Sequence, residues 1–206
     1  FFISAGIWIV VSALYLLINI KLDPGNFSLN NVSATLIPLV IISVLFIPFQ
    51  AGFEEVLFRG YLMQGFTVMV RNRLFPLVMT SVLFGLMHSL NPEVEEFGFL
   101  IMIPQYILFG LIFGVITILD DGIESAIGIH TANNAFLCIM VTNESSALQT
   151  PAIWAQHTIH PWTEFGAMIL MGIVVILVLG KIFKWKSLSF LASGVESGVE
   201  NAGQMG

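Results

Sequence analysis

The sequence predicts an all-α protein, a polytopic bundle of transmembrane helices. Only 10% of its 206 residues are charged and 57% are hydrophobic, whereas an ordinary globular domain is about 25% charged. The charges also cluster between long uncharged stretches. Because a folded chain of this length leaves much of its surface exposed, we expect lipid to cover the remaining apolar side chains.

Six uncharged stretches can each supply the roughly 20 residues that a spanning helix needs. They occupy residues 1–20, 24–53, 74–92, 97–119, 125–143 and 165–180. The last is slightly short and is expected to borrow its flanks. The sequence therefore predicts about six spans in one domain, residues 1–186. Since the chain opens on Phe1 rather than Met, this count leaves room for further helices upstream.

The basic residues predict the orientation of the bundle, because cytoplasmic loops retain Lys and Arg. With six spans, Lys21 lies alone on one side of the membrane. The other side carries Arg71, Arg73, Lys181, Lys184 and Lys186. Both ends of this chain are therefore expected to be cytoplasmic.

Net charge and the C-terminal segment set two further expectations. A net charge of -6 provides no basic surface to neutralise phosphates, which argues against a nucleic-acid partner. Residues 187–206 are rich in Ser and Gly and repeat the sequence SGVE. We expect this tail to be disordered.

Three polar motifs interrupt the apolar stretches. An ionisable side chain at membrane depth costs about 2.5 kcal/mol or more, so groups that remain there are expected to face the protein interior and to have a function. The motifs contain Glu54, Glu55 and Arg59; Phe84 and His88; and His130 and Asn134.

Helical spacing predicts how these side chains pair. Residues four apart share a helix face, so Glu55 and Arg59 can form an ion pair. Glu54 then lies on an adjacent face and is free to point elsewhere. His130 and Asn134 are also four apart and are expected to project together.

This set of groups suits the activation of water. A carboxylate near an imidazole can take a proton from water, and a second His with an Asn can donate hydrogen bonds to a developing oxyanion. Alternatively, Glu54, His88 and His130 could ligate a divalent metal such as zinc, whose bound water would be the nucleophile. Both routes lead to hydrolysis.

Sequence separation supports part of this site. Arg71 follows Glu54 by 17 residues, and His88 follows Arg71 by 17. In a helical hairpin that turns near Arg71, the two side chains would be level, each about 25 Å from the turn. His130 fits less well, since it is only nine residues after Asp121, or about 13 Å from that turn.

The three motifs together resemble those of the CPBP family, the CAAX protease and bacteriocin-processing (Abi) family, whose eukaryotic members include the type II CAAX prenyl protease. The pattern EExxxR, FxxxH and HxxxN is present without substitution. The resemblance covers roughly residues 38–141, the motif-bearing core. It implies an intramembrane endopeptidase, glutamate-dependent or metal-dependent, in a prokaryotic cell membrane.

The resemblance also implies residue roles. Glu54 would be the general base and His88 its partner in activating water, while His130 and Asn134 would stabilise the oxyanion. Glu55 and Arg59 would hold the first motif, and Phe84 would shape the site by packing. The substrate would be a membrane-associated peptide or protein, either prenylated or bacteriocin-like.

Two other classes of function remain open at this point. Glu54, His88 and His130 could form a relay in a proton-coupled or cation-coupled transporter, although the sequence shows no convincing inverted repeat. The chain could also be a noncatalytic membrane scaffold or immunity protein. Such a protein would keep its biological activity when Glu54 is replaced by Gln.

Overall fold

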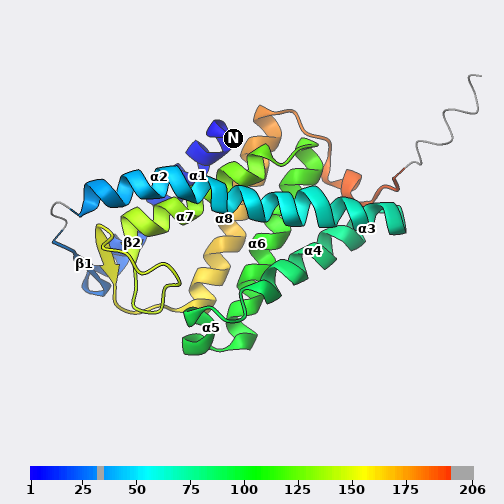
Figure 1. Cartoon of the computed structure of the whole chain (residues 1–206). Helices are drawn as coiled ribbons and strands as arrows, with labels where there is room; N and C mark the ends of the chain where they lie inside the picture. Colours follow the sequence, from blue (N-terminus) through cyan, green and yellow to red (C-terminus); the bar gives the residue numbers. More distant parts are fainter. Residues whose placement is uncertain (32–34, 196–206) are drawn as a thin grey trace, which may run out of the picture.

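The computed structural model describes residues 1–31 and 35–195, and most of these residues are helical. In chain order the α-helices are α1 (Phe2–Leu22), α2 (Leu36–Glu55), α3 (Met63–Val70), α4 (Leu74–Met87), α5 (Pro92–Phe97), α6 (Phe99–Asp120), α7 (Glu124–Met140) and α8 (Pro161–Ile182) (Figure 1). A π-helical segment (Val56–Leu62) joins α2 to α3 without a break, and short 3₁₀ turns occupy Pro24–Asn26 and Leu188–Ala192.

The predicted all-α bundle is confirmed. Within the described residues, four helices are long and apolar enough to cross a membrane: α1, the continuous helix Leu36–Val70, α6 and α8. The stretches expected to span at 74–92 and 125–143 instead form α4, of 14 residues, and α7, of 17 residues. Both are shorter than the roughly 20 residues of a full span, because His88 closes α4 and the backbone becomes extended at Val141.

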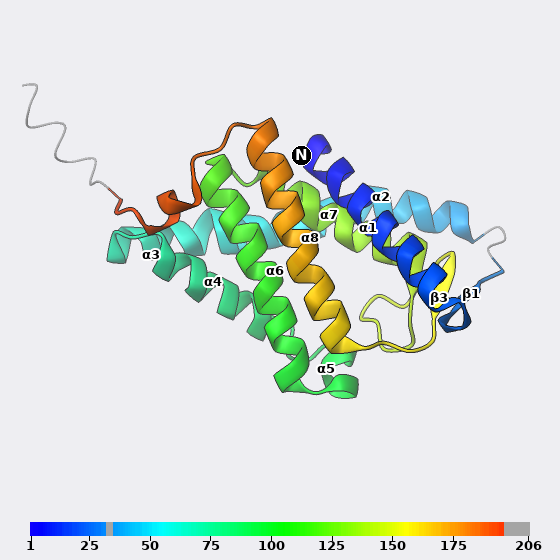
Figure 2. The ribbon, with the colours of Figure 1, turned by 180° about the vertical axis from the view of Figure 1, so that it is seen from behind.

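The helix Leu36–Val70 is the longest element, with 35 residues. At 1.5 Å per residue it measures about 52 Å, well beyond the roughly 30 Å of a hydrocarbon core. It must therefore tilt or extend past the apolar layer. Figure 1 shows it crossing in front of α6 and α8, and Figure 2, the view from behind, shows those two helices side by side in front of it.

Glycines allow neighbouring helices to pack closely against one another. A Cβ atom on Gly110 of α6 would lie 2.8 Å from the Cα of Ser81 in α4, and one on Gly85 would lie 2.5 Å from Cγ1 of Ile107. A Cβ on Gly128 of α7 would meet the carbonyl oxygen of Phe1 at 2.4 Å. Small residues at such contacts let helix backbones approach in membrane proteins. They bring α4 against α6, and α7 against α1.

The core lies where α1, α6, α7 and α8 meet. Its innermost side chains are less than 2% exposed and come from all four helices: Trp8, Phe113, Ile116, Ile129, Val175 and Leu179. The outer faces of α1, α2 and α8 carry exposed Leu, Ile, Val and Phe side chains. This inside-to-outside pattern is the one expected of helices surrounded by lipid.

A small sheet closes the opposite end of the bundle from the α3–α4 turn. Its strands are β1 (Phe27–Leu29), β2 (Val141–Thr142) and β3 (Trp154–Gln156), in the order β1-β3-β2. The β1–β3 pairing is antiparallel and the β2–β3 pairing is parallel. The sheet thereby ties the loops after α1 and α7 to the residues that precede α8.

Residues 187–195, the first part of the tail that was expected to be disordered, are structured instead. Residues 187–195 include a 3₁₀ turn, and Gly194 forms a β-bridge with Asn72. The guanidinium of Arg73 donates to the backbone oxygens of Ser193 (2.9 Å) and Gly194 (2.6 Å), and it lies 4.0 Å from the ring centroid of Phe190. These contacts order the segment. The remaining tail, 196–206, lies outside the described residues.

Candidate active site

The first motif spans the end of α2 and the start of the π-helical segment. Successive residues of a helix point about 100° apart, so the neighbours Glu54 and Glu55 enter different environments. The Glu55 side chain is fully buried, whereas that of Glu54 keeps 13% of its surface exposed. The two carboxylates are therefore suited to different tasks.

Glu55 is the centre of a buried ionic cluster. Its Oε1 atom accepts hydrogen bonds from Arg59 Nη1 at 3.0 Å and from His130 Nδ1 at 2.8 Å. The ion pair with Arg59 confirms the pairing predicted from their spacing. Arg59 also donates to the carbonyl oxygen of Gly110 at 3.1 Å, and its Cζ lies 4.6 Å from the ring centroid of Phe84. This cluster joins α2, α6 and α7.

His130 bridges the two carboxylates. An ionised carboxylate can only accept hydrogen bonds, so Nδ1 of His130 carries the hydrogen that Glu55 binds. Its other nitrogen, Nε2, lies 3.9 Å from Glu54 Oε2. The sequence separation from Asp121 predicted that His130 would fit a site with Glu54 and His88 less well, and this prediction is wrong. His130 meets Glu54 because α7 packs directly on α2, a packing that the count of residues from Asp121 did not include.

His88 lies at the C-terminal end of α4 and is held by aromatic neighbours. Its Nδ1 donates to the carbonyl oxygen of Phe84 at 2.8 Å, which leaves Nε2 as the free nitrogen. The imidazole stacks on Tyr106 with ring centroids 4.4 Å apart, and it lies 4.7 Å from the ring of Phe84. Within the described chain His88 makes no direct hydrogen bond to Glu54.

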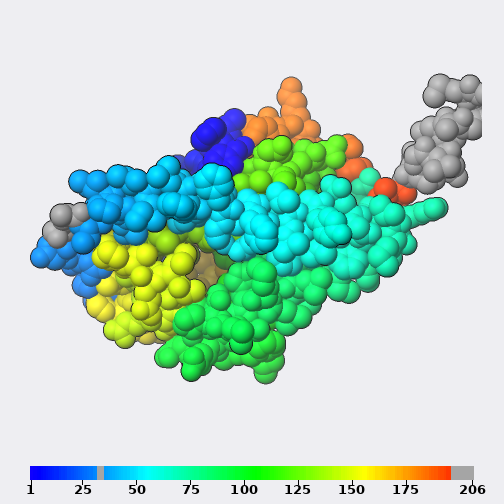
Figure 3. Space-filling view, viewed as in Figure 1, coloured from blue at the N-terminus to red at the C-terminus, as the bar shows by residue number. Residues whose placement is uncertain are grey.

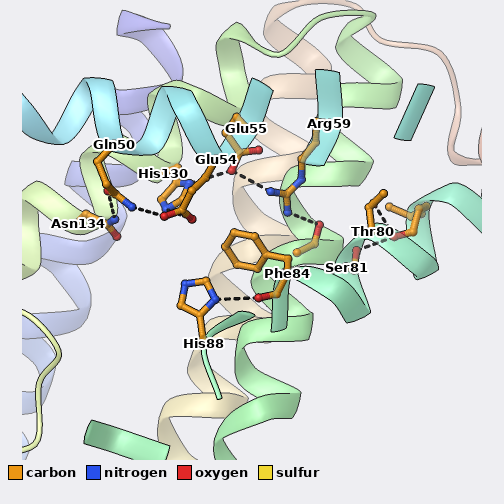
Figure 4. Close-up of polar contacts among 12 residues, drawn as sticks. Gln50, Glu54, Glu55, Arg59, Thr80, Ser81, Phe84, His88, His130 and Asn134 are labelled. Carbon is orange, nitrogen blue, oxygen red and sulfur yellow. Dashed lines mark hydrogen bonds and ion pairs between the residues drawn. The ribbon is translucent and has the colours of Figure 1, made fainter. Parts of the chain in front are cut away.

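Phe84 connects the two histidines. Its ring centroid lies 5.9 Å from that of His130 as well as 4.7 Å from that of His88. Figure 4 shows His88 and Phe84 below Glu54 and Glu55, with the free nitrogen of His88 on the ring edge turned away from the Phe84 carbonyl. The packing role expected for Phe84 agrees with this position.

Asn134 reaches Glu54 through a residue that the sequence reasoning missed. Its Nδ2 donates to Oε1 of Gln50 at 3.0 Å, and Nε2 of Gln50 donates to Oε1 of Glu54. Gln50 is a lone amide in the apolar part of α2, four residues before Glu54. That spacing is the signal that could have identified it. Asn133 and Trp8 continue the same network toward α1.

The site opens on one face of the molecule. Figure 3 shows a hollow below α2, bordered by residues near α5 and by the loop that follows α7. Gln50 is exposed, and Asn134 and His88 are partly exposed, whereas Glu55 and Arg59 are buried. Access from this face therefore reaches Glu54 before it reaches the ionic cluster.

The proposed metal ligands do not converge in this arrangement. Within residues 1–31 and 35–195, no three His, Cys, Asp or Glu side chains are grouped so that they could hold a metal ion. Nδ1 of His130 donates to Glu55 and Nδ1 of His88 donates to the Phe84 carbonyl, so each ring keeps Nε2 free, as a metal-ligating histidine also does. It is the separation of Glu54, His88 and His130, and not these hydrogen bonds, that keeps the three from forming such a group within the described residues.

The fold and the site together define a helical membrane protein with a carboxylate, two imidazoles and an amide at one opening. Comparison with known proteins agrees with that class. Residues 31–136 match the family described as type II CAAX prenyl endopeptidase Rce1-like, and the chain belongs to this family. The predicted family is thus confirmed.

One curated relative extends the comparison. The uncharacterised protein YyaK of Bacillus subtilis is 34% identical over 131 residues, which cover 63% of this chain and 44% of YyaK. The chain thus matches less than half the length of this relative. No solved structure matches the chain.

Proposed function

We propose that this protein is an intramembrane endopeptidase in which Glu54 takes a proton from the attacking water. The observation that carries the proposal is the position of Glu54 Oε2. This oxygen is buried without a hydrogen-bond partner among the described residues, lies 3.9 Å from His130 Nε2, and belongs to a side chain at the edge of an open face. Membership of the Rce1-like family supports the same class of reaction.

The two histidines have distinct roles in this proposal. Because Nδ1 of His88 donates to a carbonyl oxygen, its Nε2 can accept a hydrogen bond from the water and orient it toward Glu54. His130 acts instead as a donor. Because Nδ1 already carries the hydrogen that Glu55 binds, donation from Nε2 requires a ring with hydrogens on both nitrogens, and the proposal includes that form of His130.

The reaction then follows from these groups. Glu54 Oε2 takes one proton of the water, and the water oxygen bonds to the carbonyl carbon of the scissile peptide. The resulting oxyanion accepts hydrogen bonds from His130 Nε2 and from the second amide hydrogen of Asn134. Glu54 returns its proton to the leaving nitrogen as the C–N bond breaks.

The position of the site supports a class of substrate. Glu54 lies in a helix that is long and apolar enough to cross a membrane, which favours a peptide that approaches from the bilayer or its surface. The family description supports a prenylated peptide, while a bacteriocin-like peptide would satisfy the same requirement. We therefore propose a membrane-associated peptide, with a lipidated C-terminal segment as the first substrate to test.

The test compares Glu54→Gln with the wild-type protein in lipid nanodiscs. The probes are a farnesylated peptide and its unlipidated twin, together with mapping of new protein N-termini in cells that express either form. Glu54→Gln should abolish every cleavage that depends on the wild-type protein. The matched control is Glu96→Gln, an exposed carboxylate of α5, which should cleave normally.

Two outcomes would contradict the proposal. Cleavage retained by folded Glu54→Gln would exclude Glu54 as the base. Uptake of protons or cations by reconstituted liposomes, dependent on Glu54 and without any cleavage, would favour the transporter interpretation.

A further inference from the structure

We propose that Trp8 of α1 is a positioning residue, which fixes the orientation of the Glu54 carboxylate through a chain of four hydrogen bonds. This role rests on the proposed function of Glu54. Trp8 belongs to none of the three motifs and lies outside residues 31–136, the part of the chain that matches the family.

The hydrogen bonds run through three helices. Trp8 Nε1 donates to Asn133 Oδ1 at 3.3 Å, and Asn133 Nδ2 donates to Asn134 Oδ1 at 3.1 Å. Asn134 Nδ2 donates to Gln50 Oε1 at 3.0 Å, and Gln50 Nε2 donates to Glu54 Oε1. Figure 4 shows the last two of these contacts, from Asn134 through Gln50 to Glu54.

The two ends of the chain require the same direction of donation. The indole N–H of Trp8 can only donate, and an ionised Glu54 can only accept. Each of the three amides between them presents its oxygen toward Trp8 and its NH₂ group toward Glu54. If one amide turned over, two oxygens or two NH₂ groups would face each other. The chain therefore holds all three amides in one orientation.

Trp8 is a firm anchor for this chain. Its side chain is 1% exposed and belongs to the central core, and its ring centroid lies 6.0 Å from that of Phe109. The helices that carry Trp8 and Asn133 also pack closely, since a Cβ on Gly128 of α7 would lie 2.4 Å from the carbonyl oxygen of Phe1 and 2.5 Å from Oγ of Ser4 in α1. A rotamer change at Trp8 would thus require the core to rearrange.

The chain makes the two oxygens of Glu54 unequal. Oε1 is occupied by the amide of Gln50, whereas Oε2 has no hydrogen-bond partner in the described structure and faces His130 Nε2. Oε2 is therefore the atom that receives the proton from water, while the water oxygen bonds to the substrate carbonyl carbon. Without the chain the carboxylate could rotate and present either oxygen.

The test is a double-mutant cycle with Trp8→Phe and Gln50→Met. Each variant removes one member of the chain and keeps most of the side-chain volume. On a substrate whose cleavage depends on Glu54, each should lower kcat by roughly 10- to 100-fold and leave KM within about twofold. The double variant should be no slower than the slower single variant, because both changes break the same chain.

Independent effects would give a different result. Trp8 and Gln50 share no hydrogen bond in the described structure, and distant unconnected sites are normally additive. Multiplied losses in the double variant, or a loss confined to KM, would overturn the positioning role of Trp8. Val175→Ala, which trims the same core without touching the chain, is the packing control and should leave kcat within about twofold.

The direction of donation has its own test. Asn133→Asp keeps an acceptor for Trp8 but cannot donate to Asn134 Oδ1. It should lower kcat as much as Trp8→Phe does, and an unchanged kcat would contradict a one-way chain.

A substrate-free measurement covers the case in which no cleavage is found. The shift in melting temperature of the double variant Trp8→Phe/Gln50→Met should be smaller than the two single shifts combined. Additive shifts would contradict the proposal that Trp8 and Gln50 belong to one chain of hydrogen bonds. Failure of the proposed function is a separate result, since it would appear as cleavage retained by Glu54→Gln.

Discussion

Glu54 and Glu55 are adjacent in the sequence, but their side chains lie in two different surroundings, one partly exposed and one fully buried. Glu55 is enclosed by Arg59 and His130 in a buried cluster, where one oxygen accepts from two cationic or potentially cationic groups. Glu54 has no cation at hydrogen-bond distance; its Oε1 accepts from the neutral amide of Gln50, and its side chain keeps 13% of its surface exposed, against 0% for Glu55. Oε2 of both carboxylates has no hydrogen-bond partner among the described residues, so what separates them is access and the neighbouring charge. The difference teaches that the buried positive charge of Arg59 is placed at Glu55, whereas Glu54 is the carboxylate that a substrate can reach.

Breaking the cluster at Arg59 should have the largest effect on stability. Arg59→Met removes the arginine partner of the buried Glu55 and leaves only His130 beside it; removing one partner of a buried ion pair typically costs about 3–5 kcal/mol. We expect little folded protein after purification, measured by thermal unfolding in detergent. The double variant Arg59→Met/Glu55→Met removes both charges and should recover much of the loss. Normal stability of Arg59→Met alone would show that the cluster is not structural.

Adding a methyl group at the close contact between α4 and α6 should have the next largest effect on stability. A Cβ on Gly110 would lie 2.8 Å from the Cα of Ser81, and the carbonyl of Gly110 is also an acceptor for Arg59. Gly110→Ala should therefore cost about 1–3 kcal/mol, again read from thermal unfolding. Gly166→Ala is the matched control, because a Cβ there has no neighbour within 4 Å. Equal stability of the two variants would argue against close packing at Gly110.

Replacing His130 should affect the surroundings of both Glu54 and Glu55, and therefore both cleavage and stability. His130→Phe keeps an aromatic ring beside Phe113, which stacks on His130 at 4.9 Å, but it removes one donor to Glu55. We expect about 1–2 kcal/mol of destabilisation together with loss of cleavage. A stable variant with full activity would separate His130 from both roles.

Glu54→Gln should have the smallest effect on stability. The side chain is not fully enclosed, and a Gln oxygen can still accept from Gln50, so the free energy of unfolding should change by about 0.5 kcal/mol or less. Its melting temperature should thus resemble that of the wild type while cleavage is absent. A large loss of stability would place Glu54 in the structural region with Glu55.

The sequence predicts the class of fold and most members of the site for definite reasons. Burial of charge in an apolar helix is costly, which singles out Glu54, Glu55 and Arg59, and helical spacing pairs Glu55 with Arg59. These inferences are local. The contact between His130 and Glu54 is not local, because it depends on how α7 packs against a helix of 35 residues.

The hydrogen bonds from Trp8 to Glu54 could not be predicted from helical spacing alone, for a related reason. Neutral amides such as Gln50 and Asn133 cost less to bury than ions do, so they stand out less from an apolar sequence. Trp8 stands out even less, since an aromatic residue is ordinary in a spanning helix. Only the packing of α1 on α7 reveals that its N–H points at an amide.

The π-helical segment Val56–Leu62 has a consequence for how chain length can vary among relatives. A π-helical turn contains about one more residue than an α-helical turn, so it is the natural place for a one-residue insertion in an ancestral α-helix. Because the wider turn absorbs that residue, deleting one residue there would let the segment close as an α-helix and leave α3 in nearly the same phase relative to Glu54 and Glu55. The π-helical segment can therefore gain or lose one residue while α2 keeps facing α7 and α3 keeps facing α4.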